Sequence, residues 1–178
     1  MDSRPDRRPV IPTVALPRPE REAPPLDERD LAILEALQED GRLPISELGR
    51  RIGLSQPATS ERVKRLEERG VITGYGARID LAAIGLRMTA IIRLRTAHAH
   101  IRACLDAFAA LPAIVEVHRV TGADCFVLKA IVPAPEHLAV IVDSIGRFGE
   151  VTTSVVLRSE PVRPISRALM EAARRRPV

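Results

Sequence analysis

The 178-residue sequence predicts an α+β protein with two small domains: one of three helices, then one with the element order βαββαβ. Two observations support this prediction. Between residues 27 and 70, three short runs repeat apolar residues at helical spacing, and glycine or proline separates them. From residue 87 onward, runs typical of strands alternate with runs typical of helices, which is the split order of a ferredoxin-like domain.

The expected organisation has five segments. Residues 1–25 hold seven of the fifteen prolines and alternating charges, which predicts a disordered Pro/Arg-rich tail. The helical domain follows at 26–70, a hinge strand and linker at 71–86, and the βαββαβ domain at 87–160. Residues 161–178 form a basic C-terminal tail, in which the run ISRALMEAARRR favours a short helix.

Capping and turn residues delimit the three expected helices. Asp27 or Glu28 opens the first helix. Gly53 ends the second, since glycine adopts the left-handed conformation of a helix terminus without steric penalty. Ser55 can cap the third helix. Pro57 falls in the first turn of that helix, where a missing N–H costs nothing.

Two short helices joined by a tight turn, the second amphipathic and basic, are typical of a helix-turn-helix (winged-helix-like) domain. Thr59, Val63 and Leu66 are expected to face the other two helices. Short polar side chains at the exposed leading end can reach base edges in a major groove, and the cations that flank them can contact phosphates. The predicted DNA-binding residues are Ser55, Gln56, Pro57, Ser60, Glu61, Arg62, Lys64, Arg65 and Arg69.

The alternative for this helix is a solvated surface on which the cations pair with Glu61, Glu67 and Glu68 at helical spacing. The formal net charge of +4 does not decide between the two, because residues 26–80 hold more carboxylates than cations. The position of the cations on the third helix therefore argues for double-stranded DNA as a partner, whereas the net charge gives no support.

The two helices of the βαββαβ domain are expected to cover one face of its sheet. The other face is then bare, with apolar residues such as Val115 and Val117 available. A domain of this size buries little apolar surface alone, and a bare apolar face invites a second copy. The sequence therefore predicts a homodimer or a higher homo-oligomer such as a tetramer or octamer.

Several classes of protein are not expected. Cys104 and Cys125 show no CxxC spacing, which fits free thiols in a reducing compartment. The N-terminal segment has no continuous apolar run, so we expect neither a signal peptide nor a membrane anchor. The protein is therefore expected to be cytoplasmic.

The four histidines have no metal-ligand spacing, and the sequence contains no phosphate loop, nucleophile elbow or paired-carboxylate pattern. We expect no enzyme activity, no cofactor and no metal site.

The chain resembles a known family over roughly residues 26–160. The quoted stretches are LDERDLAILEALQEDGRLPISELGRRIGLSQPATSERVKRLEERGVITGYGARID, RVTGADCFVLKAIV and VTTSVVL. They are similar to the Lrp/AsnC family, the leucine-responsive and asparagine-responsive transcription regulators. The resemblance implies a dimer or ring-like assembly, operator binding by the helix at 55–69, and modulation by a small-molecule effector. That effector is an amino acid or related metabolite held between sensing domains.

The resemblance also implies an effector site. Family members often carry G-x-x-D in the turn between the second and third strands of the sheet, where the carboxylate meets the ammonium of the ligand. Here Gly122 matches, Cys125 occupies the carboxylate position, and Asp124 lies one residue early. The strand that often supplies T-x-T retains only Thr153. The expected effector-binding residues are thus Gly122, Asp124, Cys125 and Thr153. The alternative is a turn that Gly122 shapes and Asp124 caps, with no ligand.

Two other functions stay open. Sirohaem decarboxylases look like the Lrp/AsnC fold and hold a tetrapyrrole between domains, and His118 would be the candidate residue for such an enzyme. A sensing module that no longer binds DNA would instead show ligand-dependent assembly without retarding any promoter fragment.

Overall fold

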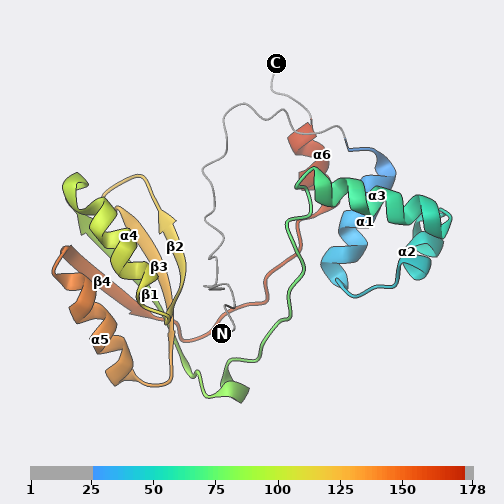
Figure 1. Ribbon diagram of the computed structural model, residues 1–178. Coiled ribbons are helices and arrows are strands. Elements are labelled where there is room, and N and C mark those ends of the chain that lie inside the picture. Colours follow the sequence, from blue (N-terminus) through green and yellow to red (C-terminus); the bar gives the residue numbers. More distant parts are fainter. Residues whose placement is uncertain (1–25, 175–178) are drawn as a thin grey trace, which may run out of the picture. The chain divides into compact units, whose positions relative to one another are not determined.

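The computed structural model describes residues 26–174, which fall into two compact units (Figure 1). One unit holds residues 79–159, and the other holds residues 26–78 together with 160–174. The tail predicted at 1–25 lies outside the described residues, as do residues 175–178. The predicted α+β class and element order are confirmed.

The helical unit is built on three helices whose ends follow the predicted caps. Asp27 caps the first in a capping box: its carboxylate accepts a hydrogen bond from the Asp30 backbone N–H at 2.9 Å, and the Asp30 carboxylate accepts one from Asp27 N–H at 3.1 Å. Gly53 ends the second helix with φ of 68°. The Ser55 hydroxyl accepts a hydrogen bond from Ala58 N–H at 3.4 Å. The helices are α1 (Glu28–Glu39), α2 (Ile45–Ile52) and α3 (Gln56–Glu68).

A small apolar core joins the three helices. From α3 it receives Val63 and Leu66, and Thr59 is buried beside them, as predicted. The Thr59 hydroxyl donates to the Ser55 carbonyl oxygen at 2.9 Å, so this buried polar group is satisfied. Because these residues turn one face of α3 inward, its opposite face is presented to solvent.

The second unit is a four-stranded antiparallel sheet with strand order β2-β3-β1-β4. Helices α4 and α5 both cover one face of it (Figure 1). Its elements, preceded by a short 3-10 helix, are η1 (Ala82–Ile84), β1 (Met88–Thr96), η2 (His98–His100), α4 (Ile101–Ala109), β2 (Ile114–Arg119), β3 (Phe126–Val132), α5 (Pro135–Gly146) and β4 (Gly149–Val155).

The structure does not place Val117 on the face of the sheet that the helices leave bare, where it was predicted. The register of β2 shifts between Ile114 and Glu116, so that Val117 pairs with Leu128 and packs against the core on the helix side. The prediction for Val117 is therefore wrong, because one extra residue in a strand reverses which face the following side chains occupy. Val115 stays 40% exposed.

The predicted hinge strand is not found among the described residues. Val71 and Ile72 pack against the helical core. Residues 73–80 form no strand and pair with no strand of the described chain. The short C-terminal helix is confirmed as α6 (Arg167–Arg174), and it belongs to the same unit as α1 to α3. No helix in residues 26–174 is both long and apolar enough to cross a membrane.

Candidate functional site

The outer face of α3 carries most of the predicted DNA-binding residues. At its leading end Gln56, Pro57, Ser60 and Glu61 are exposed, and Ser55 caps the helix. Further along, Lys64, Arg65 and Arg69 are exposed. Lys64 lies 3.7 Å from Glu68, but an exposed pair of this kind is held weakly and leaves the ammonium available. The outer face of α3 therefore carries polar groups at its leading end and cations further along the helix.

Arg62 was predicted to contact phosphate, but the structure turns it inward. Its Nη1 lies 2.7 Å from Asp27 Oδ2 and 2.8 Å from Asp30 Oδ1, and the Asp30 side chain is only 3% exposed. A buried carboxylate is costly unless a cation pairs with it. We therefore reassign Arg62 as the group that holds α3 against α1.

The same contacts act on the pKa of Asp27. Burial alone would raise the pKa of Asp27, but the hydrogen bond from Asp30 N–H and the pairing with Arg62 outweigh it and lower that pKa. A carboxyl whose pKa falls on folding stabilises the protein above its unfolded pKa of about 3.9, and this contribution is lost as the pH falls through the lowered value.

Gly49 fixes the approach of α2 to α3, and the sequence analysis missed it. A Cβ at Gly49 would lie 2.7 Å from the Leu54 carbonyl oxygen and 2.9 Å from Thr59 Oγ1. Only glycine permits an approach this close. The available signal was a glycine inside a run that is otherwise helical, which often marks close packing.

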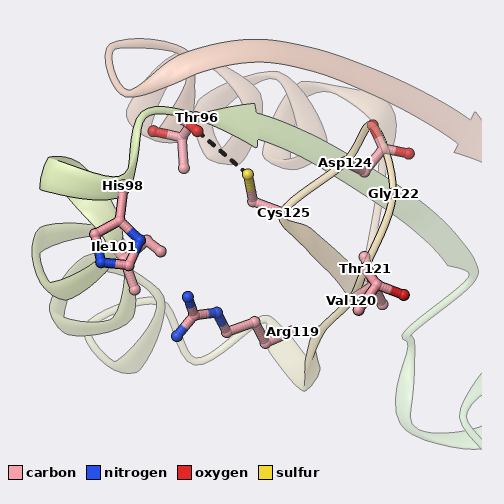
Figure 2. A pocket seen from close by; sticks show the side chains of 9 residues that line it. All are labelled: Thr96, His98, Ile101, Arg119, Val120, Thr121, Gly122, Asp124 and Cys125. Atoms are coloured by element: carbon pink, nitrogen blue, oxygen red, sulfur yellow. Dashed lines mark hydrogen bonds between the residues drawn. The ribbon is translucent and has the colours of Figure 1, made fainter.

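The sheet unit has a hollow of about 410 Å³ where β1 ends, α4 begins and β2 turns into β3 (Figure 2). Its walls include three of the four predicted effector residues, Gly122, Asp124 and Cys125. Thr153 is not among the lining residues, since it lies on β4 opposite Ile92. The hollow is lined by Thr96, His98, Ile101, Arg119, Val120, Thr121, Gly122, Asp124 and Cys125.

The polar groups around this hollow differ in what they offer a ligand. The Cys125 thiol donates to the Thr96 carbonyl oxygen at 3.2 Å, so this thiol already has a hydrogen-bond partner within the chain. In Figure 2, Asp124 extends away from His98 and Arg119. The Arg119 guanidinium has no carboxylate partner in the described part of the chain, so it is the cation available to a ligand. Sequence reasoning did not single out Arg119, because nothing in the sequence links it to Thr96 and His98 on the other side of the hollow.

His118, the residue singled out for a tetrapyrrole enzyme, lies outside this hollow. It pairs with Val127 across the ladder, and its Nε2 lies 3.5 Å from Glu116 Oε2. No group of three or more potential metal ligands occurs within residues 26–174.

Comparisons with known proteins match both units. Residues 26–73 match the winged helix-turn-helix DNA-binding family, and residues 89–163 match the Lrp/AsnC ligand binding domain. The HTH-type transcriptional regulator YezC of Bacillus subtilis is 39% identical over 142 residues, which cover 78% of this chain and 99% of YezC. LrpC of the same organism, also an HTH-type transcriptional regulator, is 33% identical over 131 residues, which cover 74% of this chain and 91% of LrpC.

Solved structures show the same fold. The structure of Bacillus subtilis LrpC superposes with a TM-score of 0.74 at 31% identity, covering 78% of this chain and 99% of that one. The regulator NMB0573 of Neisseria meningitidis, solved as a complex with L-Met, gives a TM-score of 0.73 at 27% identity, covering 82% of this chain and 100% of that one. With both units matched and the relatives covered almost end to end, the chain belongs to the Lrp/AsnC family and is a DNA-binding transcriptional regulator with a ligand-binding domain.

Proposed function

We propose that α3 enters the major groove of DNA and that its outer face makes the contacts. The residues at its leading end, Ser55, Gln56, Pro57, Ser60 and Glu61, would approach base edges, whereas Lys64, Arg65 and Arg69 would bind phosphates. The burial of Thr59, Val63 and Leu66 carries this assignment, because it leaves only that one face of α3 outward.

We expect the protein to bind as a homodimer or larger homo-oligomer in the cytoplasm. Two copies related by twofold symmetry would present their α3 helices about one turn of duplex apart, ~34 Å, so the operator would have palindromic half-sites. Residues 73–80 leave backbone groups without a ladder partner in the described chain, and a second copy of this segment could supply one. Genome-wide footprinting that includes the upstream region of the gene itself would identify the operators.

Gln56→Ala is expected to alter preference among operator sequences. An amide that makes two hydrogen bonds to a base contributes about 1–3 kcal/mol of discrimination. Changing the contacted base pair of the operator should therefore weaken binding of the Gln56→Ala variant much less than binding of the original chain. Fluorescence anisotropy on an operator and its single-base variants measures this. Lys64→Ala is the control, since losing a phosphate contact should weaken all these sequences alike. Unchanged base preference in Gln56→Ala would refute its role.

We propose that the hollow beside Gly122 holds a small effector with a carboxylate group. Arg119 is the group suited to that carboxylate, whereas the one carboxylate among the described lining residues, that of Asp124, extends away from His98 and Arg119. One relative, NMB0573, was solved with L-Met, which also carries a carboxylate. Amino acids and related carboxylic metabolites are therefore the class to test. The effector would act by binding one quaternary arrangement more tightly than another.

Arg119→Gln is expected to weaken effector binding at least tenfold, because it removes a charge-assisted hydrogen bond of about 1.5 kcal/mol or more. Isothermal titration with amino acids and their 2-oxo acid counterparts identifies the ligand and measures the loss. Asp124→Asn is the matched control and should bind within about twofold of the original chain. Equal affinity for Arg119→Gln and the original chain would place the effector elsewhere.

The alternative function is a sensing module that has lost DNA binding. The exposed cations of α3 argue against it. A protein that assembles with a ligand but retards no duplex fragment, even in dilute buffer, would support it.

A further inference from the structure

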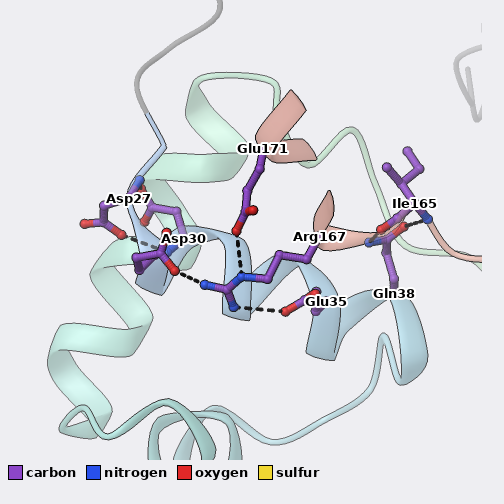
Figure 3. A network of polar contacts seen from close by, with 8 residues as sticks. Asp27, Asp30, Glu35, Gln38, Ile165, Arg167 and Glu171 are labelled. Carbon is purple, nitrogen blue, oxygen red and sulfur yellow. Dashed lines mark hydrogen bonds and ion pairs between the residues drawn. The ribbon is translucent and has the colours of Figure 1, made fainter. Parts of the chain in front are cut away.

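The C-terminal segment packs on α1 through a cluster of ionic contacts (Figure 3). The guanidinium of Arg167 on α6 lies among three carboxylates. It pairs with Glu28, approaches Glu35 Oε2 at 3.4 Å through Nη1, and donates from Nε to Glu171 Oε1 at 3.1 Å. Glu28 and Glu35 come from α1, and Glu171 follows Arg167 by one turn of α6. One cation therefore links the C-terminal helix to the first helix of the DNA-binding unit.

A second contact is independent of charge. The side-chain amide of Gln38 makes two hydrogen bonds with one residue: its Oε1 accepts from Ile165 N–H at 2.8 Å, and its Nε2 donates to the Ile165 carbonyl oxygen at 3.2 Å. The amide thus satisfies both backbone groups of Ile165 just before α6 begins. Ile165 and Leu169 are 57% and 60% exposed, so apolar burial contributes little to this contact. Polar contacts of this kind are individually weak and reversible.

The docked α6 and the helices α1 to α3 are joined to the sheet by two different connections of the chain. Strands β1 and β4 are antiparallel neighbours, with Ala90 opposite Val155, and Val156 N–H donates to the Thr89 carbonyl oxygen at 2.9 Å. The start of β1 and the end of β4 are thus neighbours at the same end of the sheet, and each continues into a connection to the helical unit. The first runs back to α3, and the second leads to Ile165 and α6. With α6 docked, the DNA-binding unit has two attachments to the sensing unit, and with α6 released it has one.

We propose that α6 is a latch, whose docking on the α1 surface formed by Glu28, Glu35 and Gln38 restrains the DNA-binding unit relative to the sensing unit. The occupant of this surface is the α6 of the same chain. The connection that enters β1 and residues 156–166 after β4 tether α6 and α1 within one chain, which raises the effective concentration of α6 to the millimolar range, at which weak contacts suffice. The functional part of this inference rests on the proposed function: a restrained unit would tolerate fewer separations between half-sites.

Hydrogen exchange on the free full-length protein tests docking without DNA. An eight-residue helix is marginal alone, so protection of its amides, such as the Met170 N–H that donates to Ser166, requires docking. We expect α6 to exchange at least tenfold more slowly in the original chain than in an Arg167→Ala, Gln38→Ala double variant, with α2 unaffected. Arg163→Ala, an exposed arginine in the same segment, is the control and should leave protection unchanged. Equal exchange of α6 in the original chain and the double variant would overturn the latch.

Cross-linking identifies which chain supplies α6. In a Cys125→Ser background, where Cys104 is buried and Arg167 keeps its contacts with Glu28 and Glu35, Q38C and I165C should be joined within one chain by a short bismaleimide. A cross-linked dimer would instead assign the α6 on this surface to a second copy and overturn the intramolecular latch.

DNA fragments whose half-sites are moved apart one base pair at a time test the consequence. When the half-sites are moved from their best spacing, the affinity of the original chain should fall at least tenfold and that of the double variant less than threefold. The two proteins should bind a single half-site with equal affinity. The same spacing profile in both proteins would overturn the restraint. If neither protein binds DNA, the proposed function fails, while the exchange result still decides whether α6 docks.

Discussion

An Arg62→Ala variant is expected to lose about 3 kcal/mol of stability in its DNA-binding unit, because breaking a buried pair leaves a carboxylate without its cation. The Asp30 side chain is nearly inaccessible, and after the substitution the one cation of residues 26–174 still paired with it is Arg65, at 3.7 Å. The chain has one tyrosine and no tryptophan, and that tyrosine, Tyr75, donates to Glu67 of α3 at 2.9 Å. Tyrosine fluorescence during urea unfolding therefore reports on this unit alone.

Two further variants show whether charge burial is the cause. Arg69→Ala removes an exposed cation at the end of α3 and should change stability by less than about 0.5 kcal/mol. Asp30→Asn in the Arg62→Ala background removes the unpaired charge but keeps an acceptor for the capping hydrogen bond, so it should recover part of the loss. An unfolding midpoint for Arg62→Ala equal to that of the original chain would show that the pair does not hold α3 in place.

Replacing Lys64, Arg65 and Arg69 together by alanine is expected to weaken operator binding by about 1,000-fold or more near 0.1 M salt. Phosphate contacts release counterions and supply most of the affinity for DNA, and a dimer would lose those made by both copies of α3. Fluorescence anisotropy with the footprinted operator measures the loss. Arg102→Ala, an exposed cation on α4, is the control and should bind DNA as the original chain does.

Local signals were enough to predict most elements of the fold. The caps at Asp27 and Ser55, the turn at Gly53 and the strand and helix order of the second unit all depend on a few neighbouring residues. The face of Val117 could not be predicted, because a bulge follows from pairing between β2 and β3 and not from the alternation within one strand. The hinge shows the same limit, since β-forming residues become a strand only beside a partner.

The candidate site was predicted where one helix determines it. Helical periodicity alone separated Thr59, Val63 and Leu66 from the outer face of α3. The inward turn of Arg62 depends on Asp30, which is 32 residues away in the chain. Arg119 lines one hollow with Thr96 and His98, which lie more than twenty residues earlier, and the docking of Arg167 on Glu28 spans 139 residues. Tertiary contacts of this kind leave no periodic trace in the sequence.

The dependence of operator affinity on salt tests the central claim most directly. For the original chain, log K should fall linearly with log salt concentration, with a slope of about −0.9 for each phosphate contacted. The Lys64, Arg65 and Arg69 triple variant should show a slope shallower by about 5 for a dimer with six lost contacts. Equal slopes for the two proteins would contradict the assignment of the outer face of α3 as the surface that binds DNA.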